Sequence, residues 1–145
     1  SNLVYIIRVE GVEITSKDAK YTLGITREPV LDADGKQKTA KNGQPETSDT
    51  YFFDGEEIAE DDFKALYQTI IGMQVSKLND DYYYDGDVAL TVHYTLNTEP
   101  NEFTVEYLEY DSDYYAVRRN GVSLFLIKRN KVDNMIDALK AFAEK

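Results

Sequence analysis

Residues 88–128 read VALTVHYTLNTEPNEFTVEYLEYDSDYYAVRRNGVSLFLIK and carry the strongest fold signal in the chain. Apolar and polar side chains alternate through most of this stretch, which is typical of β-strands that bury one face. Turn-forming sequences interrupt the alternation at 97–100, 111–113 and 120–121. Turns of this length join neighbouring antiparallel strands, so the stretch predicts four consecutive strands in a meander.

The register of these strands follows from the lengths of their turns. The Asn-Gly pair at 120–121 is the strongest two-residue hairpin signal in the chain. Together the three turns predict one apolar row across the four strands, made of Leu90, Tyr107, Val117 and Leu124. Because three independent turns agree on one apolar face, the pattern favours a real meander.

The opposite face of the same strands is predicted to be polar at one end and apolar at the other. At the polar end Glu106 and Arg118 fall opposite each other, and His93, the only histidine, is expected to be a surface strand residue. The apolar end holds Leu108, Tyr110, Tyr114, Ala116, Phe125 and Ile127. Since large apolar patches are seldom left exposed, we expect a helix or the segment 3–9 to cover this end; the alternative cover is a partner protein.

Two segments have the apolar spacing of amphipathic helices. Apolar side chains recur at i, i+3, i+4, i+7 and i+8 from Phe63 to Ile71, and Gly72 is a suitable stop. A second apolar stripe begins near Lys131, with Asn130 expected as its N-cap. Both helices should pack one face on the sheet.

Shorter strands are predicted at 3–9 and 21–26, and a hairpin at 50–58. Residues 28–49 are polar, and we expect either a long hairpin tip or a mobile loop there. The 145 residues together predict one α+β domain, an antiparallel meander β-sheet with two amphipathic helices packed on it. Strands followed by a helix occur twice, which indicates two related β-then-α halves.

Composition excludes several classes of protein. The chain has no cysteine, so disulfides, thiolate catalysis and Cys-ligated zinc are excluded. A net charge of −11 argues against nucleic-acid partners and against docking on anionic lipid. No apolar run approaches the ~20 residues of a membrane span, so the domain itself should not insert. The chain opens with Ser1-Asn2 rather than Met, so we expect an excised domain whose anchor or signal lies outside these residues.

No catalytic set stands out, and we expect neither an enzyme nor a cofactor. Gly-rich phosphate loops, GxSxG elbows and HExxH motifs are absent. Acidic residues in two loops are weak candidates for a cation site, since hard cations prefer clustered carboxylates; they are Asp80, Asp81, Asp111 and Asp113. Their spacing fails the EF-hand pattern, so a solvated acidic loop is the favoured interpretation.

Tyrosines are concentrated in the second half of the chain. Eight of the twelve lie between residues 82 and 115, among them Tyr82, Tyr83 and Tyr84. Rigid amphipathic rings beside carboxylates can form a surface for a protein or a sugar, although tyrosine is also a favoured strand residue. The predicted interaction surface consists of the apolar reverse-face residues and these rings: Leu108, Tyr110, Tyr114, Phe125, Ile127, Tyr82, Tyr83 and Tyr84.

Five stretches resemble a bacterial family, the domain of unknown function 4340. They are YTLGIT at 21–26, TYFFDGEEI at 50–58, YYAVRRNG at 114–121, FLI at 125–127 and KVDN at 131–134. The resemblance implies a domain held outside the cytoplasmic membrane by an N-terminal anchor, in a family often encoded beside ABC-transporter components. The family has no established catalytic residues, so none is carried over to this chain.

The resemblance and the absence of a catalytic set point to the same class of function. We expect a non-enzymatic, extracytoplasmic protein-interaction module, accessory to a membrane transporter complex. The alternative is a ligand-binding module for a cation or a glycan that uses the acidic, tyrosine-rich loops. Neither the partner nor the oligomeric state follows from the sequence.

Overall fold

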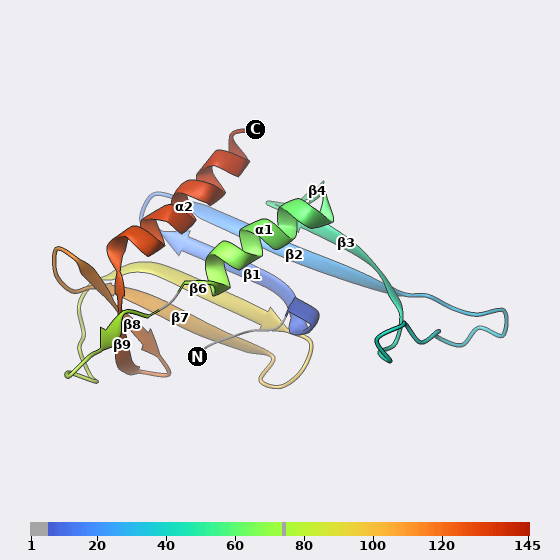
Figure 1. The fold of residues 1–145 in the computed structure, drawn as a ribbon, viewed down its shortest axis with the longest axis horizontal. Coiled ribbons are helices and arrows are strands. Elements are labelled where there is room, and N and C mark those ends of the chain that lie inside the picture. The colour runs from blue at the N-terminus through green and yellow to red at the C-terminus, as the bar shows by residue number, and fades with distance from the viewer. Residues whose placement is uncertain (1–5, 74) are drawn as a thin grey trace.

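A single antiparallel sheet of nine strands carries two helices on one face (Figure 1). The computed structural model describes residues 6–73 and 75–145. In chain order the elements are η1 (Ile6–Arg8), β1 (Val9–Ser16), β2 (Lys20–Pro29), β3 (Thr47–Phe53), β4 (Glu56–Ile58), α1 (Glu60–Ile71), β5 (Lys77–Leu78), β6 (Val88–Leu96), β7 (Glu102–Glu109), β8 (Tyr114–Arg119), β9 (Val122–Lys128) and α2 (Arg129–Ala143). The order across the sheet is β4-β3-β2-β1-β6-β7-β8-β9-β5, which confirms the predicted α+β class.

The domain is built from two halves with the same topology. In each half four strands form an antiparallel meander and a helix follows: β1–β4 with α1, then β6–β9 with α2. The halves join through their first strands, since β1 pairs with β6 and Ile14 lies opposite Val92. This confirms the two β-then-α halves. Strand β5 stands outside the repeat, because it belongs to the linker between the halves and pairs with β9.

The face under the helices, here the front face, holds the main core (Figure 1). Helix α1 buries the predicted stripe, with Phe63 and Tyr67 at 0% and 1% exposure. Helix α2 packs beside it and buries Met135 and Leu139. The acidic first turn of α1 lies at the positive end of the helix dipole, which stabilises it.

Helix α2 begins slightly earlier than its sequence indicates. It starts at Arg129, and Lys128 is the N-cap, without a side-chain hydrogen bond. The prediction that Asn130 caps this helix is therefore wrong, because the chain already turns helical before that residue.

The register of the last hairpin differs from the prediction by one residue. Pairing from β6 to β8 is as predicted, with Tyr107 opposite Val117. The Asn120-Gly121 turn also forms, but an extra residue in β9 places Val117 opposite Phe125 instead of Leu124. A one-residue shift reverses the faces of a strand, so Phe125 and Ile127 turn to the front face and Leu126 to the other.

Residues 28–49 form a hairpin tip, one of the two predicted alternatives. Strand β2 continues to Pro29 and β3 begins at Thr47. The tip between them projects beyond the body (Figure 1). Two isolated bridges order it, Leu31 with Gln37 and Thr39 with Pro45.

The first strand begins later than predicted and runs to Ser16. It begins at Val9, and Ile6–Arg8 form a 3-10 turn, so the strand predicted at 3–9 is wrong over 6–8. Residues 3–5 of that prediction lie outside the described residues. Within the described part of the chain, no helix combines the length and the apolar content needed to cross a membrane.

Candidate functional site

The linker from α1 to β6 wraps around the edge of the second half. We call its residues 79–87 the strap. Its first residue, Asn79, is 1% exposed, and its amide donates a hydrogen bond to Ser123 Oγ at 3.2 Å. Backbone hydrogen bonds join Asn79 to Leu124 and Ser123 to Tyr82. The strap therefore first runs along β9, on the outer edge of the sheet.

The strap then crosses the face opposite the helices, the reverse face. Register places Leu108, Ala116 and Leu126 side by side there, and all three are buried, at 0–2% exposure. Tyr84 of the strap packs on them together with Tyr114. The predicted apolar reverse face is thus covered within the chain. The strap covers it, so the prediction that a helix or the segment 3–9 covers this face is wrong.

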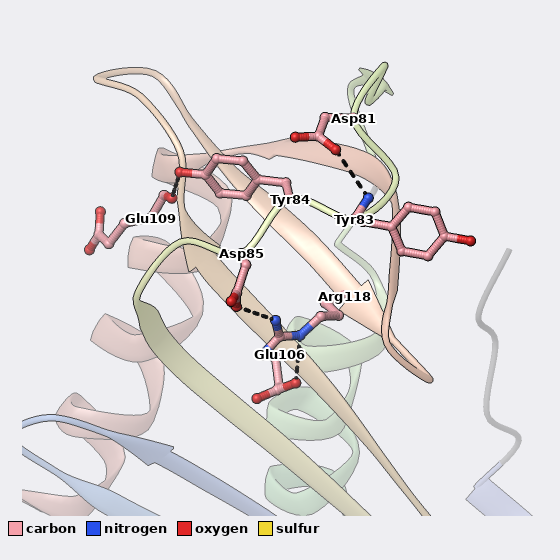
Figure 2. A network of polar contacts seen from close by, with 7 residues as sticks. All are labelled: Asp81, Tyr83, Tyr84, Asp85, Glu106, Glu109 and Arg118. Atoms are coloured by element: carbon pink, nitrogen blue, oxygen red, sulfur yellow. Dashed lines mark hydrogen bonds and ion pairs between the residues drawn. The ribbon is translucent and has the colours of Figure 1, made fainter.

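Polar contacts fasten the strap to the strands beneath it (Figure 2). The Tyr84 hydroxyl donates a hydrogen bond to the Glu109 carbonyl oxygen at 2.5 Å. The Arg118 guanidinium contacts Glu106 at 2.9 Å, which confirms the predicted pair, and also Asp85 at 3.0 Å. Hydrogen bonds to Glu106 first, and then to Asp85, raise the pKa of Arg118 above its usual value. Arg118 therefore stays charged and links the strap to β7.

Apolar and aromatic side chains remain exposed where the strap runs along the sheet edge. Tyr83 is 78% exposed, Leu78 70%, Tyr82 51% and Leu124 42%. We call these four residues the outer rim. Their backbones are neighbours, because the segment 78–82 is hydrogen-bonded to β9. Figure 2 shows Tyr83 directed away from Tyr84, outward from the strands.

The backbone around the rim is held in place by local side chains. Asn79 Oδ1 accepts a hydrogen bond from the Asp81 N–H at 3.1 Å, and an Asp81 carboxylate oxygen accepts one from the Tyr83 N–H at 3.2 Å. Since Asn79 is itself buried against Ser123, these bonds connect the rim to the core. The exposed rings therefore sit on an ordered support.

The four acidic candidates for a cation site do not converge. The Asp81 carboxylate is used by the strap, and Asp111 accepts hydrogen bonds from the N–H groups of Asp113 and Tyr114 at 2.9 and 2.8 Å. Among residues 6–73 and 75–145, no group of three or more His, Cys, Asp or Glu side chains is arranged to hold a metal ion. Asp80, Asp81, Asp111 and Asp113 are thus turn and surface residues in this structure.

The predicted interaction residues divide into two groups. Leu108 and Ile127 are 0% and 1% exposed, so assigning them to a surface is wrong; Ile127 packs in the main core and Leu108 lies under Tyr84. Phe125 is half-buried and lies on the front face, because the extra residue in β9 reverses the faces of that strand. Phe125 and Ile127 lay on the predicted outer face only because the β9 bulge was not anticipated, whereas Leu108 lies on the predicted face but is covered by the strap.

The remaining predicted residues lie at or near the surface of the second half. Tyr82 and Tyr83 belong to the outer rim, and Tyr110 is 37% exposed and packs edge-on against Tyr84 at 5.0 Å. Tyr114 is half-buried, with the Lys77 ammonium 4.4 Å above its ring. Sequence reasoning missed Leu78, which belongs to no periodic pattern, and it placed Leu124 in the buried apolar row, from which the extra residue in β9 removes it.

His93 has ordinary strand partners. Its Nδ1 lies 2.8 Å from Thr104 Oγ1, and its Nε2 lies 3.6 Å from a Glu102 carboxylate oxygen.

Two surface hollows are small. One of about 240 Å³ lies between α2 and the sheet, and one of about 230 Å³ lies between the helices; both are below the roughly 300 Å³ at which ligand pockets usually begin. Neither hollow therefore has the volume of a usual ligand pocket.

Comparison with family models, with curated proteins and with solved structures finds no match to this chain. The resemblance to the domain of unknown function 4340 family stays a prediction.

Proposed function

We propose that this chain is a non-enzymatic protein-interaction module that acts outside the cytoplasmic membrane as an accessory of a transporter complex. The location and the transporter come from the family resemblance alone. The outer rim supplies the contact surface in this proposal. Its exposed rings, Tyr82 and Tyr83, are the most exposed part of the predicted surface.

One observation carries the proposal: the exposed rim is ordered. Tyrosine is enriched at protein interfaces, since it offers a large amphipathic surface with few rotatable bonds. Here Tyr83 is 78% exposed while the backbone that bears it is hydrogen-bonded to Asp81 and, through Asn79, to the core. A surface that is already ordered loses less entropy on binding, so it favours affinity.

A crosslinking experiment in living cells tests the proposal. The photoreactive residue benzoylphenylalanine replaces Tyr83 in the full-length protein, expressed in its own host, and adducts are identified by mass spectrometry. The control carries the same residue at Glu57, on the opposite edge of the sheet. The proposal predicts an adduct with one envelope protein at Tyr83 and not at Glu57. No adduct at Tyr83, or the same adducts at both positions, contradicts it.

A second candidate is binding of a glycan, because the same rim could serve as a stacking platform. The Tyr83 ring is exposed, the Asp81 carboxylate accepts a hydrogen bond from the Tyr83 N–H, and aromatic rings with acidic groups nearby suit sugar hydroxyls. A glycan panel read by thermal shift discriminates between the two functions. Stabilisation by one glycan that Tyr83→Ala abolishes would favour this candidate, and no shift across the panel would reject it.

A further inference from the structure

We propose that the outer rim binds an extended, basic segment of the partner, which lies along β5 as an added strand. This inference rests on the proposed function and goes further, since it specifies the chemistry of the partner and its mode of binding.

The two edges of the sheet are protected to different degrees. Free edges can pair with other strands, and proteins commonly block them with short strands and exposed charges. At one edge the three-residue strand β4 presents Glu56 and Glu57, both exposed. At the other edge the two-residue strand β5 presents Leu78, which is 70% exposed. The β5 edge is therefore the apolar one.

The one cation in β5 does not protect this edge. The Lys77 ammonium lies over the ring of Tyr114, 4.4 Å from its centroid, and Tyr114 packs on the reverse-face cluster. The lysine is thus engaged with the reverse face beside β5. An incoming strand would meet Leu78 and the rings of the strap.

The charges next to the rim select a basic partner. The strap, residues 79–87, has four acidic residues and no lysine or arginine. In the strap, Asp85 is paired with Arg118, whereas Asp80 and Asp81 form no ion pair among the described residues. Complementary charge raises the association rate and the specificity of an interface, so unpaired carboxylates beside apolar rings suit arginine or lysine.

An extended segment fits both features at once. In strand addition the main chain supplies hydrogen bonds, and alternate side chains supply specificity. A segment that alternates basic and apolar residues would place its apolar side chains toward Leu78 on one face and its cations toward Asp80 and Asp81. Arginine could also stack on the exposed rings of the strap.

The test uses three labelled decapeptides and the 145-residue domain, with binding followed by fluorescence anisotropy. One peptide alternates arginine and valine. The second replaces arginine by glutamate. The third alternates arginine and proline, so it keeps the charge, but proline removes every second backbone N–H and disfavours pairing as a strand. The arginine–valine peptide should bind at least tenfold more tightly than the arginine–proline peptide, and the glutamate peptide should not bind.

Matched variants separate the rim from the overall negative charge. Asp80→Asn/Asp81→Asn removes two charges at the rim, while asparagine at 81 keeps the side-chain oxygen that accepts from Tyr83 N–H. Glu56→Gln/Glu57→Gln removes two charges at the other edge. The first should weaken binding of the arginine–valine peptide about fivefold or more and the second by less than twofold. Tyr82→Ser/Tyr83→Ser, at constant charge, should weaken it about tenfold. Circular dichroism verifies that each variant is folded.

Several results would overturn the inference. Equal affinity for the arginine–valine and arginine–proline peptides, or equal losses from the two charge-matched pairs, would show that only the net charge of −11 attracts the peptide. A Tyr83 crosslink to a partner segment without basic residues would reject this inference and leave the proposed function standing. Absence of both the crosslink and peptide binding would reject both.

Discussion

The two halves of the molecule share a topology but differ on their reverse faces. In the first half that face is mostly small and polar, since Gly11 lies opposite Gly24 and Glu13 lies opposite Thr22, although the half-buried Phe52 also lies there, opposite Gly24. It requires no cover. In the second half the corresponding face buries Leu108, Ala116 and Leu126 beneath the strap. Among the described residues, therefore, only the reverse face of the second half is covered, and its cover is the strap.

The difference comes from the linker between the halves. After α1 the chain must reach the start of β6, and it does so around the edge of β9 and across the reverse face (Figure 1). The first half has no corresponding linker among the described residues. The comparison shows how one fold repeated twice can acquire a distinct surface, because the strap places Tyr82 and Tyr83 at an edge whose counterpart presents Glu56 and Glu57.

The largest expected effect tests whether the halves share one core. Phe63 is 0% exposed and lies 5.0 Å from the Tyr51 ring and 6.2 Å from the Tyr67 ring. Phe63→Ala should cost about 3–5 kcal/mol of unfolding free energy, because it removes a buried ring and leaves a cavity. Urea titration followed by circular dichroism measures this loss.

The number of steps in that urea titration tests whether the two halves unfold together. Because α1 packs on α2 in one core, Phe63→Ala should unfold in one cooperative step, as should Leu139→Ala in α2. A two-step transition, in which one half stays folded, would show that the halves are separate units. Tyr82→Ala at the exposed rim is the matched aromatic control and should change stability little.

The next effect is alkaline destabilisation by buried tyrosines of the front face. Burial raises the pKa of Tyr107 from 10.0 to about 12, and it raises the pKa of Tyr67 and Tyr94 as well. The folded state holds these protons more tightly than the unfolded state. Their contribution to stability is therefore complete below about pH 10 and is lost as pH rises from there through the folded-state pKa.

The Tyr107→Phe variant isolates one of these groups. Between about pH 8 and about pH 11, ionisation of Tyr107 should lower the stability of the wild-type protein by roughly 1–1.5 kcal/mol. The variant should not show this part of the loss. Urea titrations at both pH values measure the difference. An equal loss in the two proteins would show that the Tyr107 hydroxyl is solvated in the folded state.

Local rules of sequence were sufficient for most of the front face. Turn length predicted the pairing of Tyr107 with Val117, and the helical spacing predicted burial of Phe63 and Leu139. These features depend on residues that are close in sequence. The register of β9 could not be predicted in this way, because its extra residue accompanies the burial of Ser123 against Asn79, a contact between distant parts of the chain.

The candidate site was predicted in part for the same reason. The exposed rings at Tyr82 and Tyr83 were predicted from composition, since three consecutive tyrosines are flanked by aspartates there. The position of the outer rim could not be predicted from the sequence. Strand β5 has two residues and no periodic pattern, so the pairing that brings Leu78 beside β9 leaves no local signal.

A smaller effect tests how the strap is fastened. Tyr84→Phe keeps the ring on the reverse-face cluster and removes the hydroxyl that donates to the Glu109 carbonyl oxygen. The loss should be about 0.5–1.5 kcal/mol, typical of one hydrogen bond. Tyr83→Phe is the control, since its ring is 78% exposed, and it should have almost no effect. Equal losses in the two variants would show that the Tyr84 hydroxyl does not fasten the strap.

The smallest expected effect concerns the ion pair between the strap and β8. Asp85 is 85% exposed in its contact with Arg118, and Arg118 keeps its second partner, Glu106, when Asp85 is replaced. Asp85→Asn should therefore cost only about 0.2–1 kcal/mol, and less at high salt because exposed pairs are screened. Hydrogen exchange should rise at the Tyr84 amide and stay unchanged in β2, since only the second half depends on the strap. A salt-independent loss well above 1 kcal/mol, or faster exchange in both halves, would mean that this pair supports the whole sheet and that the halves are not as different as their reverse faces indicate.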